Sequence, residues 1–188
     1  MRRQPEEFRI LVVDDEPEVL DLLEGYLKEQ GEYVEGTMTA EGAIRRQQEK
    51  GFDLLVVDIN LPDMNGIDLI GRVRQFDSEA EFVIITGYAS LKTAVEAIRL
   101  GAFDYLVKPF KLEELGVAVK NAKEKILLRR LNGQLLSRLR SLYEEIERYG
   151  GIGTQAEQRA EEEREATKAL LEHIRVLEGL RKRRFFID

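Results

Sequence analysis

The fold is decided by residues 9–16, which read RILVVDDE. The first five of them, residues 9–13, form a short and mostly apolar run, and three acidic residues follow it directly. A run of this length that ends in polar residues is typical of a strand buried on both faces of a sheet. We therefore predict a central strand over residues 9–13 that brings Asp14, Asp15 and Glu16 to one edge of the sheet.

Similar apolar runs recur along the chain, and amphipathic stretches with helical spacing separate them. The runs cover residues 33–38, 54–57, 82–85 and 103–107, and the amphipathic stretches cover residues 19–27, 40–48, 67–73 and 91–98. A fifth amphipathic stretch begins near Leu112. Strict alternation of strands and helices predicts a five-stranded parallel sheet with helices on both faces, which is a doubly wound α/β domain.

The chain of 188 residues divides into two parts of different composition. Over residues 1–123, acidic residues outnumber basic residues by 24 to 15, whereas over residues 124–188 basic residues outnumber acidic residues by 14 to 12. The second part lacks Pro and strand-like runs and is rich in Leu, Glu and Arg, a composition typical of long helices. We predict an acidic globular domain over 1–123 and a helical tail over 124–188.

Composition also excludes several classes of protein. The sequence has no Cys, which excludes disulfides, thiolate zinc sites and cysteine catalysis. The longest uninterrupted apolar runs, such as residues 10–13, are far too short to span a membrane. The first residues are basic but lack the apolar stretch of a secretory signal. We therefore expect a cytoplasmic protein with no membrane association.

Polar residues follow the predicted strands at the points where the strands end. Asp58, Thr86 and Lys108 each come directly after an apolar run. Because the carboxyl ends of parallel strands meet at one edge of a sheet, we expect these side chains beside Asp14 and Asp15. Clustered carboxylates repel one another unless a cation lies among them, and Mg²⁺ prefers such oxygen ligands.

The same edge has the groups that phosphoryl transfer needs. The Lys108 ammonium and the Thr86 hydroxyl are suited to bind phosphoryl oxygens. A carboxylate such as that of Asp58 can act as a nucleophile and form an acyl phosphate. The pattern predicts a site that moves a phosphoryl group onto an Asp.

Each of these residues also has a simpler interpretation. Asp15 is suited to cap a helix that begins at Pro17. Asp58 and Lys108 are common residue types in turns, and Tyr105 is of a kind often half-buried beside a core. Their joint position at successive strand ends is what favours the site.

Four stretches resemble the receiver domain of two-component response regulators. They are LVVDDE at residues 11–16, VVDINLPDMNG at 56–66, TGYA at 86–89 and KPF at 108–110. The resemblance covers roughly residues 8–123, and the region from Gly87 to Leu106 is most similar to receivers of the nitrogen-regulator type. It implies a flavodoxin-like sheet with strand order 2-1-3-4-5.

The resemblance also implies a role for each acidic residue. Asp58 would accept a phosphoryl group from the phosphohistidine of a cognate sensor histidine kinase. Asp15 and Asp58 would bind Mg²⁺ directly, together with the backbone carbonyl of Asn60, and Asp14 would act through water. The chain would then be a phosphoacceptor rather than an enzyme acting on a separate substrate.

The resemblance assigns the switch to residues on the last two strands. Thr86 and Lys108 would bind the transferred phosphoryl group, and Tyr105 would rotate inward as Thr86 moves. The Lys108–Pro109 peptide bond is expected to be cis.

An apolar stripe at helical spacing begins the tail. It comprises Leu128, Leu131, Leu135, Leu139, Leu142, Ile146 and Tyr149. We predict one helix from residue 112 to residue 149, a break at the glycines of 150–153, and a second helix over about 155–184. The stripe favours a two-fold homodimer, and the alternative is a helical hairpin in which Leu170, Ile174 and Leu177 cover it, alone or as half of a four-helix bundle.

No familiar output domain follows the receiver-like region. There is no Walker-type glycine loop, and basic residues of the tail alternate with Glu, which argues against nucleic-acid binding. The basic residues 181–184 suit a helix end or a contact with an acidic partner. The leading hypothesis is that phosphorylation controls the dimer state or an unknown protein partner of the tail. The alternatives are a DNA-binding transcriptional regulator, or a phosphorelay intermediate using His173, whose neighbours match no phosphotransfer helix.

Overall fold

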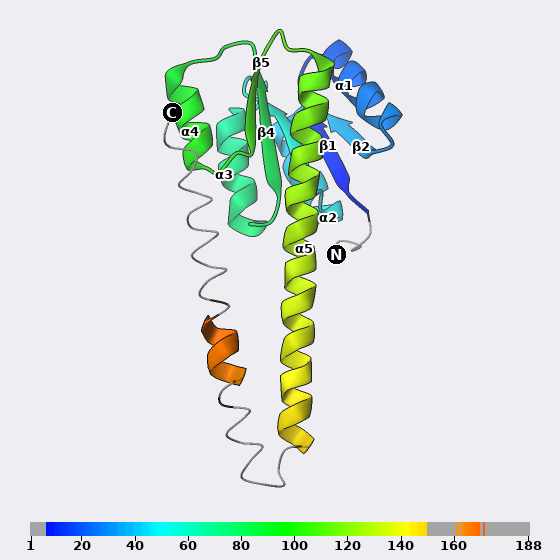
Figure 1. Cartoon of the computed structure of the whole chain (residues 1–188). Helices are drawn as coiled ribbons and strands as arrows, with labels where there is room; N and C mark the ends of the chain where they lie inside the picture. Colours follow the sequence, from blue (N-terminus) through cyan, green and yellow to red (C-terminus); the bar gives the residue numbers. More distant parts are fainter. Residues whose placement is uncertain (1–6, 150–160, 162, 170, 172–188) are drawn as a thin grey trace. The chain divides into compact units, whose positions relative to one another are not determined.

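The computed structural model describes residues 7–149, 161, 163–169 and 171. The chain divides into two compact units, Met1–Leu131 and Asn132–Asp188. Strands and helices alternate strictly through the described part of the first unit (Figure 1). Their bounds are β1 Arg9–Val13, α1 Pro17–Glu29, β2 Tyr33–Thr37, α2 Ala40–Lys50, β3 Leu54–Asp58, α3 Gly66–Phe76, β4 Glu81–Thr86, α4 Leu91–Arg99, β5 Asp104–Val107 and α5 Leu112–Tyr149.

The five strands form one parallel sheet with the order β2-β1-β3-β4-β5. The three inner strands β1, β3 and β4 are buried almost throughout, which explains their near-continuous apolar sequences. The edge strand β5 is partly exposed. The predicted doubly wound fold and strand order are confirmed.

Helices lie on both faces of the sheet (Figure 1), and two layers of apolar side chains fill the space between the sheet and these helices. Side chains alternate along each strand, so Ile10 and Val12 pack with α1 and α5, whereas Leu11 and Val13 pack with α2, α3 and α4. The sheet is therefore held on both faces. Its carboxyl edge is fixed in place by the burial of the strands that lead to it.

Local sequence accounts for where the helices begin. Thr39 caps α2 by accepting a hydrogen bond from the Gly42 N–H, and Ser90 caps α4 through a reciprocal capping box with Thr93. Helix α1 begins at Pro17 after Glu16, whose side chain makes no capping bond. The interpretation of Asp15 as the cap of this helix is therefore wrong.

Helix α5 packs its first turns on the sheet and ties its later residues to it by ion pairs. Leu115 and Ile126 are buried. Arg129 pairs with Glu81 at 3.0 Å, and Arg130 pairs with Asp53. Both acidic partners are buried, so the first unit includes Arg129 and Arg130, beyond the predicted boundary at residue 123.

In the second unit, the predicted continuation of the helix is present as far as Tyr149. The Tyr143 hydroxyl lies 2.8 Å from the Thr167 Oγ1, and Arg164 pairs with Glu147. Part of the tail thus packs beside α5 within one chain. The break at 150–153, the apolar residues Leu170, Ile174 and Leu177, and His173 lie outside the described residues.

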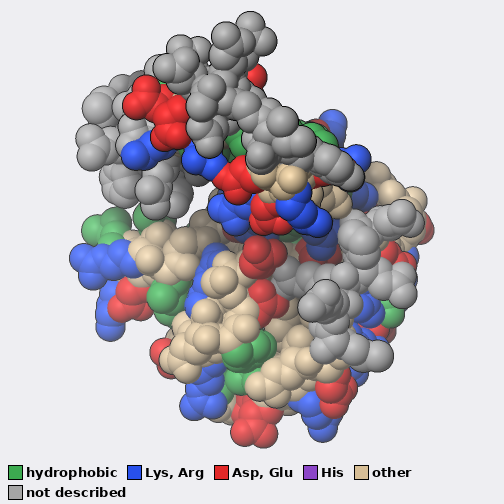
Figure 2. All heavy atoms as spheres, turned by 90° about the horizontal axis from the view of Figure 1, so that it is seen from below, with side chains coloured by type: hydrophobic (Ala, Val, Ile, Leu, Met, Phe, Trp, Pro, Cys, Tyr) green, Lys and Arg blue, Asp and Glu red, His purple; other side chains and the backbone are tan. Residues whose placement is uncertain are grey.

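Charged side chains of both signs are interspersed over the face in Figure 2, with small apolar areas between them. Among the described residues, no helix is both long enough and apolar enough to cross a membrane.

Candidate functional site

The carboxyl edge of the sheet carries the candidate site. Asp14 and Glu16 follow β1, Asp58 is the last residue of β3, and Thr86 is the last residue of β4. Lys108 follows β5 and reaches back across the edge to the carboxyl ends of β1 and β3. The topology therefore brings together residues that are 50 and 94 positions apart.

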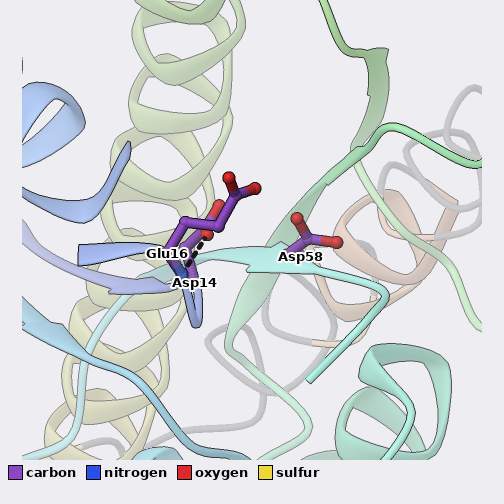
Figure 3. Close-up of side chains that lie close together, drawn as sticks. All are labelled: Asp14, Glu16 and Asp58. Carbon is purple, nitrogen blue, oxygen red and sulfur yellow. Dashed lines mark hydrogen bonds between the residues drawn. The ribbon is translucent and has the colours of Figure 1, made fainter. Parts of the chain in front are cut away.

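Three carboxylates, those of Asp14, Glu16 and Asp58, form what we call the acidic cluster (Figure 3). One oxygen of each lies within 4.8 Å of the others. Asp14 and Asp58 are buried, whereas Glu16 is exposed. Asp15 is exposed and is not a member of this cluster. Glu16, rather than Asp15, therefore lies beside Asp14 and Asp58 in this structure, and the metal-binding role of Asp15 stays a prediction.

Lys108 is the cation that faces the acidic cluster. Its ammonium donates to Asp58 Oδ2 at 2.6 Å and Asp14 Oδ2 at 2.9 Å, and it lies 3.3 Å from Glu16 Oε1. Burial alone would lower the pKa of Lys108, but these hydrogen bonds outweigh burial and raise it. Lys108 therefore stays protonated across the physiological range.

Burial has the opposite consequence for Asp14. Removal from water raises the pKa of its carboxyl group, and the hydrogen bonds from Lys108 and from the Glu16 N–H only partly offset that rise. A single ammonium cannot neutralise three carboxylates. The cluster therefore has the oxygen ligands and the surplus negative charge that suit a hard divalent cation such as Mg²⁺.

The loop between β3 and α3 is folded tightly against Asp58. The Asn60 N–H donates to Asp58 Oδ1 at 2.9 Å, and Asn60 forms an isolated bridge with Asn65. The Gly66 N–H donates to the Ile59 carbonyl at 2.8 Å. A Cβ at Gly66 would lie 2.2 Å from the Asp58 carbonyl oxygen, so only glycine fits there.

The two predicted switch residues have different partners. Thr86 is fully buried, and its Oγ1 accepts a hydrogen bond from the Tyr88 N–H at 3.1 Å. The Tyr105 hydroxyl lies 2.9 Å from Thr93 Oγ1, at the first turn of α4. The Lys108–Pro109 peptide bond is cis, as the resemblance implies.

Sequence reasoning missed three residues near this edge. The sequence indicates Glu16 only as the last residue of the acidic run at 14–16, and that run is the signal that points to it. Thr93 could have been found from its capping-box spacing with Ser90. Asp63 contacts α2 through the loop, and no periodic pattern indicates such a contact.

Comparison with known proteins agrees with this geometry. Residues 10–120 match the family described as the response regulator receiver domain. The chain belongs to this family. The receiver match covers all five strands except the first residue of β1, together with the start of α5.

Three known proteins place this receiver among its relatives. The regulatory protein AtoC of Escherichia coli is 37% identical over 114 residues, which cover 61% of this chain and 25% of AtoC. The receiver domain of a LuxO repressor protein from Vibrio parahaemolyticus has a TM-score of 0.64 and 29% identity, over 66% of this chain and 96% of that one. The beryllofluoride-activated NtrC4 receiver dimer has a TM-score of 0.60 and 34% identity, over 63% of this chain and 98% of that one.

The chain matches only part of its longer relatives. It covers about a quarter of AtoC and 53% of the response regulator PhoP of Pseudomonas aeruginosa. The shared part is the receiver.

Proposed function

We propose that Asp58 accepts a phosphoryl group from the phosphohistidine of a sensor kinase, and that this modification switches the protein. The contact that best supports the proposal is the 2.6 Å hydrogen bond from Lys108 to Asp58 Oδ2 at the carboxyl edge of the sheet. In this step, an Asp58 carboxylate oxygen forms a bond to phosphorus while the bond from phosphorus to the histidine nitrogen breaks. The electron pair of the broken bond stays on the imidazole.

The receiver family generally uses Mg²⁺, and the acidic cluster has suitable oxygen ligands. Asp14, Asp58 and the backbone carbonyl of Asn60 are the groups that would hold the ion, joined by Asp15 once its exposed side chain turns toward them. When bound, Mg²⁺ supplies positive charge to the carboxylate and phosphoryl oxygens that meet at the edge. Glu16, the exposed member of the cluster, makes the longest of the three contacts with Lys108 in the unmodified protein.

The remaining residues respond to the new phosphoryl group. Lys108 pairs with its oxygens, since the ammonium is already fixed beside Asp58. The Thr86 hydroxyl turns from its contact with the Tyr88 N–H to donate to a phosphoryl oxygen. Tyr105 then leaves Thr93 and turns inward, which alters the surface formed by α4 and β5.

Phosphorylation changes either the self-association of the chain or the binding of a partner protein by its tail. We place this switch in a cytoplasmic protein. Leu135, Leu139, Leu142 and Ile146 remain 42–54% exposed. Exposed leucines at this spacing on a helix favour contact with another helix. The activated dimer of the NtrC4 receiver is consistent with self-association on activation.

Control of transcription is the second candidate output. Several relatives carry names such as transcriptional regulatory protein, including ZraR of Klebsiella oxytoca at 35% identity. This alternative requires binding to DNA. Retention of the full chain on DNA that weakens with salt in the manner of phosphate contacts would favour it over the protein partner.

The proposed modification is tested by labelling. The full chain is incubated with Mg²⁺ and radiolabelled acetyl phosphate, beside Asp58→Asn and the control Asp68→Asn on the exposed face of α3. We expect the wild type and Asp68→Asn to be labelled and Asp58→Asn to remain unlabelled with an unchanged circular dichroism spectrum. Equal labelling of Asp58→Asn would refute the assignment.

A further inference from the structure

Asp63 connects the loop of the phosphorylation site to a helix from another part of the chain. It lies in the loop between β3 and α3, where its side chain is exposed. Its Oδ1 accepts from the Ala40 N–H and its Oδ2 accepts from the Glu41 N–H, both at 2.9 Å. Both oxygens of an exposed carboxylate are thus committed to the first turn of α2.

Helix α2 already has a cap of its own. Thr39 Oγ1 accepts from the Gly42 N–H at 3.1 Å, and the Thr39 carbonyl accepts from the Ala43 N–H at 3.0 Å. The two N–H groups that remain, those of Ala40 and Glu41, are the ones that donate to Asp63, and Ala40 is fully buried. The Asp63 carboxylate thus completes the hydrogen bonding of this helix end from outside the helix, and in doing so it ties the loop to α2.

The same loop is fastened at its base to the candidate site. Asn60 donates its N–H to Asp58 Oδ1 and bridges to Asn65. The Asp63 contact holds the middle of the loop, between those two fastenings. A loop held at its base and in its middle has little freedom to move its backbone relative to Asp58.

Helix α2 is itself connected to the opposite side of the acidic cluster. The Asp14 N–H donates to the carbonyl of Thr37 at 3.3 Å, and α2 begins three residues after Thr37. Contacts therefore run from Asp14 through Thr37 and α2 to Asp63, and along the loop to Asp58. Lys108 closes this ring by bonding to both Asp14 and Asp58.

We propose that Asp63 is a positioning residue, which anchors the loop 59–65 to α2 and so holds the Asn60 backbone beside Asp58 for Mg²⁺ binding. The role of Asp63 in Mg²⁺ binding rests on the proposed function. The anchoring of the loop to α2 by Asp63 does not depend on a metal. Asp63 does not touch the reacting atoms, so it acts through Asn60 alone.

The test compares two ways of weakening the same end of α2. Asp63→Ala removes the contacts between α2 and the loop, whereas Thr39→Ala removes the helix's own cap and leaves the loop contacts in place. Asp63→Asn is a milder variant, because an amide has one acceptor oxygen in place of two. Asp68→Asn controls for the loss of one negative charge.

The first measurement is made without metal. We expect the Asn60 amide hydrogen to exchange with solvent about tenfold faster in Asp63→Ala, less so in Asp63→Asn, and at the wild-type rate in Thr39→Ala. Mg²⁺ titration should show about a tenfold loss of affinity in Asp63→Ala, in line with other residues that orient metal ligands. Labelling by acetyl phosphate should slow at low Mg²⁺ and recover at saturating Mg²⁺.

The outcomes separate this inference from the proposed function. Equal effects of Thr39→Ala and Asp63→Ala on Asn60 exchange would overturn it, because Asp63 would then be only a helix cap. Wild-type Asn60 exchange in Asp63→Asn and Asp63→Ala would overturn it too. A wild type that binds no Mg²⁺ and takes no label would defeat the proposed function, while the exchange rates would still decide whether Asp63 holds the loop.

Discussion

The Lys108 ammonium lies 2.6 Å from Asp58 Oδ2, so the proposed phosphoacceptor is paired with a cation before any reaction occurs. Because Lys108 also bonds to Asp14, it is the main counter-charge to two buried carboxylates. Removing it should therefore change stability as well as chemistry.

Lys108→Gln should be less stable than the wild type by about 1–3 kcal/mol near neutral pH, since two buried carboxylates lose their cation. The deficit should shrink as pH falls, because burial raises the pKa of Asp14 and its protonation removes the repulsion between the two carboxylates. Urea unfolding at several pH values measures it. Lys111→Gln, at an exposed position, is the matched control. A deficit that does not vary with pH would contradict this explanation.

Asp14 and Asp15 should behave differently although they are adjacent. Burial raises the pKa of Asp14 in the folded state, so its ionised form costs stability. That cost is absent below the unfolded pKa and appears as pH rises through the folded pKa. Asp14→Asn should therefore be more stable than the wild type at neutral pH without Mg²⁺, and this advantage should vanish in acid.

Asp15 is exposed, so Asp15→Ala should leave the free energy of unfolding within about 0.5 kcal/mol of the wild type. It should still weaken Mg²⁺ binding if Asp15 turns toward the ion. Unfolding curves with and without Mg²⁺ measure both effects. Identical Mg²⁺ stabilisation of the wild type and Asp15→Ala would remove Asp15 from the metal site.

Thr86→Ala should separate phosphorylation from switching. The variant keeps Asp58 and Lys108, so it should be labelled, but it lacks the hydroxyl that would move toward the phosphoryl group. We expect the Tyr105 ring resonances to shift on addition of beryllofluoride in the wild type and in Thr86→Ser, and to stay in place in Thr86→Ala. A full Tyr105 shift in Thr86→Ala would require another route between the two sites.

Arg130 should contribute more to stability than its place on a charged helix suggests. It pairs with Asp53, which is buried and also accepts from the Arg9 N–H at 3.0 Å. Arg130→Met should cost about 2 kcal/mol, less than a fully buried pair because Asp53 keeps other contacts. Arg138→Met, at an exposed position of the same helix, should cost almost nothing. Urea unfolding of both variants tests the difference.

Self-association of the tail can be tested by sedimentation. The double variant Leu135→Glu with Leu142→Glu places charges on two exposed apolar positions of α5. If these leucines contact a second copy, the wild type should sediment as a dimer and the double variant as a monomer. The wild type could instead stay monomeric at tens of micromolar, with and without beryllofluoride. The apolar stripe would then be explained by packing within one chain, of the kind that the contact between Tyr143 and Thr167 shows.

Features set by periodicity could be predicted from the sequence. The five strands, the order of the elements and the length of α5 follow from apolar spacing, and the ends of the strands indicated Asp58, Thr86 and Lys108. Contacts between exposed or charged residues far apart in sequence could not be predicted this way. In the sequence Arg130 resembles an ordinary solvated residue of a charged helix, and only the structure shows its ion pair with the buried Asp53. Asp63 likewise leaves no pattern that points to α2.

The distance between Asp14 and Asp58 in the acidic cluster is set by the backbone of the sheet rather than by their side chains. Asp14 and Asp58 follow Val13 and Val57, which lie opposite each other on the neighbouring strands β1 and β3. Adjacent strands are about 4.8 Å apart because the hydrogen bonds between them fix that distance. This spacing between strands sets the distance between the two carboxylates, and that distance suits a small ion with oxygen distances of about 2.1 Å. Substitution of the acidic side chains can alter how tightly an ion is held. The spacing between β1 and β3 changes only if the sheet itself unfolds.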